Sequence, residues 1–102
     1  MVSCMALASN VFAASVDHEQ FICGQKQITL GMAIEKARLD CGPFGQPDFI
    51  SEHSRPNRKV SNELDNHFDI YEKWLYKSPI NGDTHILFKN GQVIRIFNIL
   101  PN

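Results

Sequence analysis

The segment Trp74–Ile96 reads Trp-Leu-Tyr-Lys-Ser-Pro-Ile-Asn-Gly-Asp-Thr-His-Ile-Leu-Phe-Lys-Asn-Gly-Gln-Val-Ile-Arg-Ile. Two runs rich in β-branched and aromatic residues flank Asn90-Gly91, which suits a two-residue turn because both residues tolerate a positive φ. A third such run, Phe68–Tyr76, precedes the breaker segment Ser78–Asp83. The three runs therefore predict a three-stranded antiparallel meander.

The turn also predicts the register of the hairpin. Phe88 should oppose Val93, and the next pairs should be Leu87 with Ile94 and Ile86 with Arg95. One face would then carry Ile86, Phe88, Val93 and Phe97, and the other Leu87, Ile94 and Ile96. A single short helix cannot cover both faces. We expect Leu87, Ile94 and Ile96 to form a partly exposed apolar face that binds a protein partner, unless the segment 43–67 folds over it as core.

A helix is expected at about residues 32–40. Apolar residues recur there at three- and four-residue spacing and form one face. Gly42 fits the left-handed position after a helix, and Pro43 prevents continuation. Ala33 stands where a Ser or Thr cap is common, so the helix start should lack a side-chain cap. The residues of the apolar face are Leu30, Ile34, Ala37 and Cys41.

The remaining segments give weaker patterns. Two short apolar runs, Phe21–Cys23 and Gln27–Leu30, fit short strands. The segment 43–59 holds three prolines and is expected to be a loop. Residues 60–67 fit a short helix. A small basic patch in this part of the chain could contact an anion or be a solvated loop; it comprises His53, Arg55, Arg58 and Lys59.

These elements predict one α+β domain, with one main helix packed on a three- to four-stranded antiparallel sheet. Trp74 and Tyr76 alternate along one face of a strand, and the apolar face of the helix needs a partner surface. We expect Trp74 to pack against that helix and its indole N–H to find a polar partner.

Length and charge limit the possible partners. The chain has 102 residues and a net charge of −1, which suits a single small domain without strong attraction to nucleic acid. After the N-terminus there is no run of about 18 apolar residues, so the mature chain is not expected to insert stably into a membrane.

The N-terminal segment resembles a secretory signal. Its first charged residue is Asp17, and Val11 and Ala13 fit the small-residue rule for cleavage before Ala14. The usual basic region is missing, so either translation starts upstream or the segment is not a signal. We predict a signal peptide at 1–13, a domain at 14–102, and a periplasmic or secreted location.

Removing residues 1–13 leaves two cysteines, Cys23 and Cys41. In an exported protein such a pair most often forms a disulfide, which would bring their Cα atoms within about 7 Å. Two reduced, buried cysteines in a cytosolic protein are the alternative. No Cys-x-x-Cys motif supports a zinc site or thiol exchange.

Several short motifs occur in a recurring order: Cys23-Gly24, Gly31-Met32, Cys41-Gly42 followed by Pro43 or Pro47, Trp74-Leu75-Tyr76, and Phe88-Lys89-Asn90-Gly91. This order resembles small bacterial exported proteins of the domain-of-unknown-function family 2845. It is similar, more distantly, to outer-membrane assembly lipoproteins of the SmpA/OmlA type, whose fold resembles the β-lactamase-inhibitor protein. The displaced proline departs from the pattern, and no convincing lipid-attachment cysteine is present.

The sequence offers no catalytic, cofactor-binding or metal-binding residues. The four histidines lack partners at metal-ligand spacing, and no Gly-x-Ser-x-Gly, phosphate-loop or dinucleotide motif occurs. Our first hypothesis is a non-enzymatic exported module, stabilised by a disulfide, that binds a protein or another envelope component and needs no cofactor. The alternative is a small periplasmic hydrolase or redox enzyme with an unrecognised site.

Overall fold

The computed structural model describes residues 15–56 and 68–100. The chain forms β1 (Ser15–His18), β2 (Gln20–Cys23), β3 (Lys26–Thr29), α1 (Ile34–Cys41), β4 (Phe49–Pro56), β5 (Phe68–Tyr76), β6 (Asp83–Lys89) and β7 (Gln92–Ile99). The expected signal peptide, the expected helix at 60–67, and Arg58 and Lys59 lie outside the described residues.

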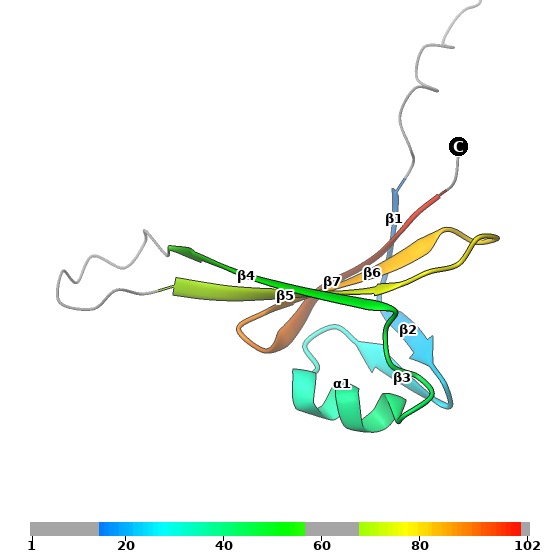
Figure 1. The fold of residues 1–102 in the computed structure, drawn as a ribbon, viewed down its shortest axis with the longest axis horizontal. Coiled ribbons are helices and arrows are strands. Elements are labelled where there is room, and N and C mark those ends of the chain that lie inside the picture. Colours follow the sequence, from blue (N-terminus) through cyan, green and yellow to red (C-terminus); the bar gives the residue numbers. More distant parts are fainter. Residues whose placement is uncertain (1–14, 57–67, 101–102) are drawn as a thin grey trace, which may run out of the picture.

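A five-stranded antiparallel sheet in the order β1-β7-β6-β5-β4 forms the centre of the fold, and β2 and β3 form a separate hairpin. Figure 1 shows α1 and the β2–β3 hairpin together on one side of the large sheet. The expected fold class is wrong: strands make up 60% and helix 11% of the described structure, so this is a mostly β protein rather than one main helix on a sheet.

The segment expected to be a loop contains an eight-residue strand, β4, and this accounts for much of the difference. All eight residues of β4 pair with β5, from Phe49 opposite Leu75 to Pro56 opposite Phe68. Of the three prolines that suggested a loop, Pro43 and Pro47 precede β4, and Pro56 ends it at the edge of the sheet. Proline is tolerated at a sheet edge because no ladder hydrogen bond is lost there.

The predicted meander of β5, β6 and β7 is confirmed. Asn90 and Gly91 have φ of 51° and 82°, and Phe88 pairs with Val93 as expected. The pairs beyond it are wrong. A register shift next to Leu87 and Phe88 leaves Ile94 as an extra residue, so that Leu87 pairs with Arg95 and Ile86 with Ile96. Such a bulge moves every later side chain of the strand to the other face.

The core lies between the large sheet and the layer formed by α1 and the β2–β3 hairpin. The helix starts at Ile34, two residues after the expected start, and buries three of the four predicted positions, whereas Leu30 precedes it and is 48% exposed. As expected, Ala33 makes no side-chain cap and Gly42 has a positive φ of 69°. The buried core residues are Cys23, Ile28, Ile34, Ala37, Cys41, Trp74, Ile86, Phe88, Val93 and Ile96.

The prediction for Trp74 is confirmed. Its side chain is fully buried in the core cluster that contains Ile34 and Ala37 of the helix. The indole Nε1 donates a 2.7 Å hydrogen bond to Glu72 Oε2, and this carboxylate also accepts a 3.1 Å bond from Arg38. A buried indole N–H thus has a partner, and the charge of Glu72 is balanced.

Candidate binding surfaces

The face of the large sheet opposite α1 and the β2–β3 hairpin is called the open face here, because no described element packs on it (Figure 1). Its side chains follow from strand alternation and from the observed register. From β4 to β1 they are Phe49, Ser51, His53 and Arg55; Asp69, Tyr71, Lys73 and Leu75; Asp83, His85, Leu87 and Lys89; Arg95, Phe97 and Ile99; and Ser15 and Asp17.

Three aromatic rings on the open face hold cationic side chains. The Cζ atom of Arg55 lies 5.7 Å, and the Nζ atom of Lys89 lies 6.0 Å, from the centroid of the Tyr71 ring. Arg95 lies 4.1 Å from the centroid of Phe97. Cations over ring faces are attracted by the ring quadrupole, by about 0.5–1 kcal/mol at exposed sites. The rings therefore orient the cationic groups and leave them accessible to a ligand.

The third ring is Phe49 of β4, which is 59% exposed. Lys77, the residue that follows β5, lies 5.8 Å from its centroid. Two histidines complete the aromatic content of the face. His53 stacks on Tyr71 and His85 stacks on Phe97. The face thus combines ring surface with positive charge over four of its five strands.

Positive charge exceeds negative charge on this face. Four Lys and Arg residues of the face, Arg55, Lys73, Lys89 and Arg95, are joined by Lys77, which lies beside it over Phe49, whereas the acidic residues are Asp17, Asp69 and Asp83. Two of the acidic residues already form ion pairs: Asp69 with Lys89 at 3.7 Å, and Asp17 with Arg95 at 2.8 Å. Within residues 15–56 and 68–100, the other three cations form no ion pair.

The effect of this charge is visible at His85. Burial lowers the pKa of its imidazole, and the positive charge of Lys73 lowers it further, while Asp83 acts in the opposite direction. The imidazole Nδ1 is buried and has no hydrogen-bond partner among the described residues. Burial and the neighbouring positive charge thus both favour the neutral form of the His85 imidazole.

The three residues expected to form a partner-binding face do not lie together. Leu87 is half-buried on the open face, and Ile94 is 46% exposed at the bulge. Ile96 is fully buried on the covered face, opposite Ile86. Of the basic patch expected from the sequence, His53 and Arg55 do lie on the open face.

Sequence analysis missed the other charged and aromatic residues of this face. Tyr71 and Lys73 alternate with buried Glu72 and Trp74 along β5. This alternation is visible in the sequence, but by itself it predicts only a strand. Lys89 follows from its pairing with Tyr71. The face of Arg95 and Phe97 depends on the register across the bulge, which no sequence pattern revealed.

Replacing Ile96 by serine is expected to lower the free energy of unfolding by about 2–5 kcal/mol, because a fully buried side chain leaves a cavity and a polar hydroxyl in its place. Ile94→Ser is the matched control on the same strand, and its loss should stay within about 1 kcal/mol since Ile94 is half-exposed. Urea denaturation followed by circular dichroism measures both. Equal losses would contradict the placement of the bulge.

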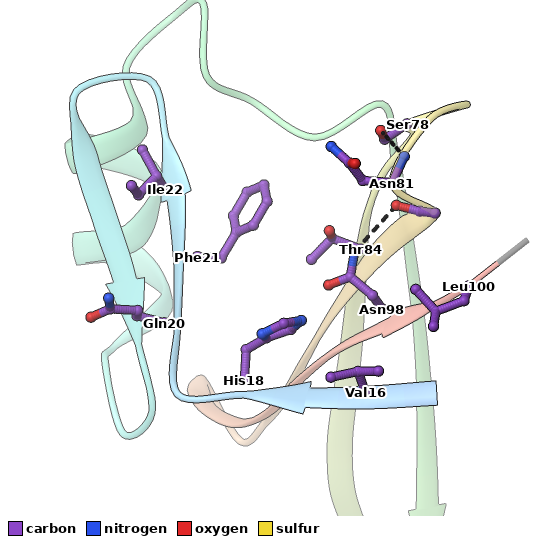
Figure 2. Close-up of a pocket in the computed structure, with 11 residues that line it drawn as sticks. Val16, His18, Gln20, Phe21, Ile22, Ser78, Asn81, Thr84, Asn98 and Leu100 are labelled. Carbon is purple, nitrogen blue, oxygen red and sulfur yellow. Dashed lines mark hydrogen bonds between the residues drawn. The ribbon is translucent and has the colours of Figure 1, made fainter. Parts of the chain in front are cut away.

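A second surface is a groove of about 580 Å³ between the β1–β2 segment and the turn that joins β5 to β6 (Figure 2). Val16, Phe21 and Leu100 supply apolar walls, and His18 and Thr84 add polar groups. The Asn98 amide nitrogen donates a 3.2 Å bond to the carbonyl of Gly82, which holds the turn against β7. The groove is open to solvent. Figure 2 shows its polar side chains spread from Ser78 and Asn81 at the turn to His18 at the other end.

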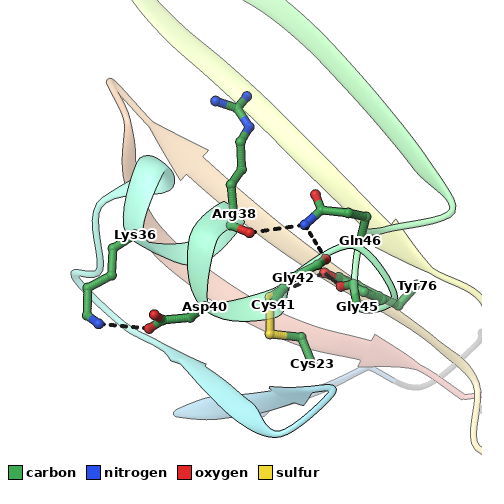
Figure 3. Close-up of a disulfide and its surroundings, with 9 residues drawn as sticks. All are labelled: Cys23, Lys36, Arg38, Asp40, Cys41, Gly42, Gly45, Gln46 and Tyr76. Atoms are coloured by element: carbon green, nitrogen blue, oxygen red, sulfur yellow. Dashed lines mark hydrogen bonds and ion pairs between the residues drawn. A yellow bond between two sulfur atoms is a disulfide. The ribbon is translucent and has the colours of Figure 1, made fainter.

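The predicted disulfide is confirmed. Cys23 at the end of β2 is bonded to Cys41 at the end of α1, with Cα atoms 5.1 Å apart (Figure 3). The cysteines are 2% and 5% exposed, so the bond is shielded from thiols in solution. Shielding of this kind is typical of a structural disulfide.

The loop after α1 packs closely around this disulfide. The hydroxyl of Tyr76 donates a 2.8 Å bond to the carbonyl of Gly45. Burial, and secondarily the negative charge of Asp48, raises the pKa of this hydroxyl above its usual range, so it stays protonated as the donor. A Cβ on Gly45 would overlap the carbonyl of Cys41, and only glycine therefore fits this position.

Within the described ranges, His, Cys, Asp and Glu side chains form no group of three that could hold a metal ion. In the same part of the chain, no helix is long and apolar enough to cross a membrane.

Comparison with protein-family models, curated proteins and solved structures finds no match for this chain. The resemblance to family 2845 and to the SmpA/OmlA lipoproteins therefore stays a prediction.

Proposed function

We propose that the protein is an exported, non-enzymatic binding module of the bacterial envelope that holds an acidic protein partner on its open face. The proposal includes the signal peptide at 1–13 and the relation to the exported proteins of family 2845. The disulfide between Cys23 and Cys41 supports it, because disulfides persist mainly outside the cytosol.

The positive excess of the open face is the observation that carries the proposal. Five Lys and Arg side chains lie on or beside this face, which holds three aspartates, although the whole chain has a net charge of −1. Charge is thus separated between the two sides of the sheet. An acidic protein would meet an excess of complementary charge on the open face, which favours correct orientation and fast association.

Ring surface strengthens the proposal. Tyr, Phe and Arg are enriched at the centres of protein interfaces, where they supply a large contact area. Tyr71 with Arg55, and Phe97 with Arg95, are such pairs. The alternative of a hydrolase or redox enzyme lacks a comparable observation, and the shielded disulfide disfavours thiol exchange.

Charge reversal tests the proposal. The double variant Lys73→Glu/Lys89→Glu should capture at least tenfold less of its acidic partner from an envelope extract, because the centre of the open face becomes negative. The matched control is Lys26→Glu/Lys36→Glu, which changes the net charge equally on the other side of the sheet. Capture is measured by quantitative mass spectrometry with tagged mature protein.

Melting temperatures check that both variants remain folded. If the open-face variant and the control retain the same proteins at the same levels, the open face is not the binding surface. If the acidic partner is lost equally with both variants, the contribution of charge is not specific to this face. Either result would contradict the proposal.

A further inference from the structure

The outer edge of β4 is the longest unpaired edge of the described structure. The strand lies at the end of the sheet order, and its eight residues pair with β5 on the inner side only. All eight are exposed, and no described strand pairs with the outer side. Such an edge presents a row of unpaired N–H and C=O groups, onto which another strand can add.

The side chains of β4 show which strand would fit. Phe49, His53 and Arg55 point to the open face, whereas Ile50 and Glu52 point to the covered face. An added strand lies about 4.8 Å from β4, so its alternate side chains come beside those of β4 on each face. On the open face these neighbours are ring surface and positive charge, and they favour acidic side chains.

Arg55 is the residue on the edge that best selects for an acid. Its guanidinium lies over Tyr71, whose ring also carries Lys89. The acid that already sits nearby, Asp69, pairs with Lys89 at 3.7 Å. A carboxylate beside Arg55 would therefore meet a cation that has no ion-pair partner within the described ranges.

A second copy of this chain fits the edge less well. Directly opposite residues in an antiparallel pair point to the same face of the sheet. Two β4 strands related by two-fold symmetry can therefore pair along most of their length only if one residue, Glu52 or His53, lies opposite its own copy. The first places Glu52 against Glu52, and the second places His53 against His53. Both join two cationic faces side by side, which is unfavourable.

We propose that β4 binds an extended segment of the acidic partner, which adds a sixth strand to the sheet and directs acidic side chains onto the open face at alternate positions. This inference rests on the proposed function and names the structure of its ligand. Main-chain hydrogen bonds to the edge would supply affinity, and the alternating side chains would supply specificity. Charge on both sides of β4 and Pro56 at its end limit pairing with unselected strands.

The test uses eight-residue capped peptides with the mature protein. The first alternates Thr and Glu, and the second alternates Thr and Lys. Two further versions of the first peptide carry N-methyl groups, either on every Glu or on every Thr. N–H groups of alternate residues point to opposite edges of a strand, so only one of the methylated versions should fail to pair with β4.

We expect the Thr-Glu peptide to bind and the Thr-Lys peptide to bind at least tenfold more weakly. One methylated version should bind with at least tenfold lower affinity than the Thr-Glu peptide, and the other should bind with the same affinity. Arg55→Glu should weaken the parent peptide at least tenfold, whereas the control Lys26→Glu should not. Fluorescence anisotropy measures affinity. Amide hydrogen exchange by NMR should show new protection at alternate residues between 49 and 55, whose N–H groups point to the outer edge of β4, and none at β1.

Other outcomes overturn the inference. If both methylated peptides bind like the parent and Arg55→Glu still weakens binding, acidic ligands dock by charge alone; the edge proposal fails and the proposed function stands. The edge proposal also fails, and the proposed function stands, if no peptide binds but the variant Lys73→Glu/Lys89→Glu no longer captures the acidic partner. If β4 amides become protected with rising protein concentration alone, the occupant is a second copy. If no peptide binds and that variant also keeps its partner, both proposals fail.

Discussion

Replacing Trp74 by alanine is expected to lower the free energy of unfolding by about 3–5 kcal/mol, the range for removing a large aromatic side chain from a core. The indole is fully buried and packs against Phe88 with ring centroids 4.7 Å apart. Its loss also removes a donor from the buried carboxylate of Glu72. Urea denaturation followed by far-ultraviolet circular dichroism is the appropriate measurement, because Trp74 is the single tryptophan of the chain.

Two controls separate the contributions to this effect. Trp74→Phe keeps a ring in the core and removes the N–H, so its cost includes a smaller ring and one lost hydrogen bond to a charged group, itself worth about 1.5–3 kcal/mol. Tyr71→Ala removes a ring from the same strand on the open face. Its cost should be clearly smaller than that of Trp74→Ala, because Tyr71 is half-buried and has no element packed on it. Equal costs for the two alanine variants would contradict the assignment of the covered face.

The sequence predicted those parts of the fold that depend on local patterns. Asn90-Gly91 determined the hairpin because a turn with two positive φ angles accepts few other residues. The alternation around Trp74 indicated which side of β5 is buried. The spacing of Ile34, Ala37 and Cys41 indicated the face of the helix. Each of these signals spans only a few residues and needs no knowledge of distant partners.

The parts that could not be predicted depend on pairing between distant segments. All residues of β4 are exposed, so its sequence shows no alternation of apolar and polar residues that would indicate a strand. It forms a strand by pairing with β5. The bulge at Ile94 is a property of two strands in register, and it decides that Ile96 is core and Arg95 is on the open face. The open face was therefore not predictable as a surface, although Tyr71 and Lys73 already alternated correctly.

Loss of the disulfide is the second large effect that we expect. Cys23→Ser/Cys41→Ser should lower the free energy of unfolding by about 2–5 kcal/mol, as is typical when a small exported domain loses a native disulfide. The two residues are 18 apart, and in the chain-entropy model a loop of about this size contributes about 3 kcal/mol by restricting the unfolded chain. The double variant is preferred to Cys23→Ser, because a free Cys41 could form a disulfide with another molecule.

Two measurements test where this stabilisation arises. The intact protein in excess reductant should unfold at a urea concentration close to that of the double variant, since both lack the covalent bond. The denaturant slope should rise in both, because an uncrosslinked unfolded chain exposes more surface to urea. An unchanged midpoint after complete reduction in the unfolded state would contradict a stabilising role. A lower midpoint with an unchanged slope would instead place the effect in the folded state, at the contact between β2 and the end of α1.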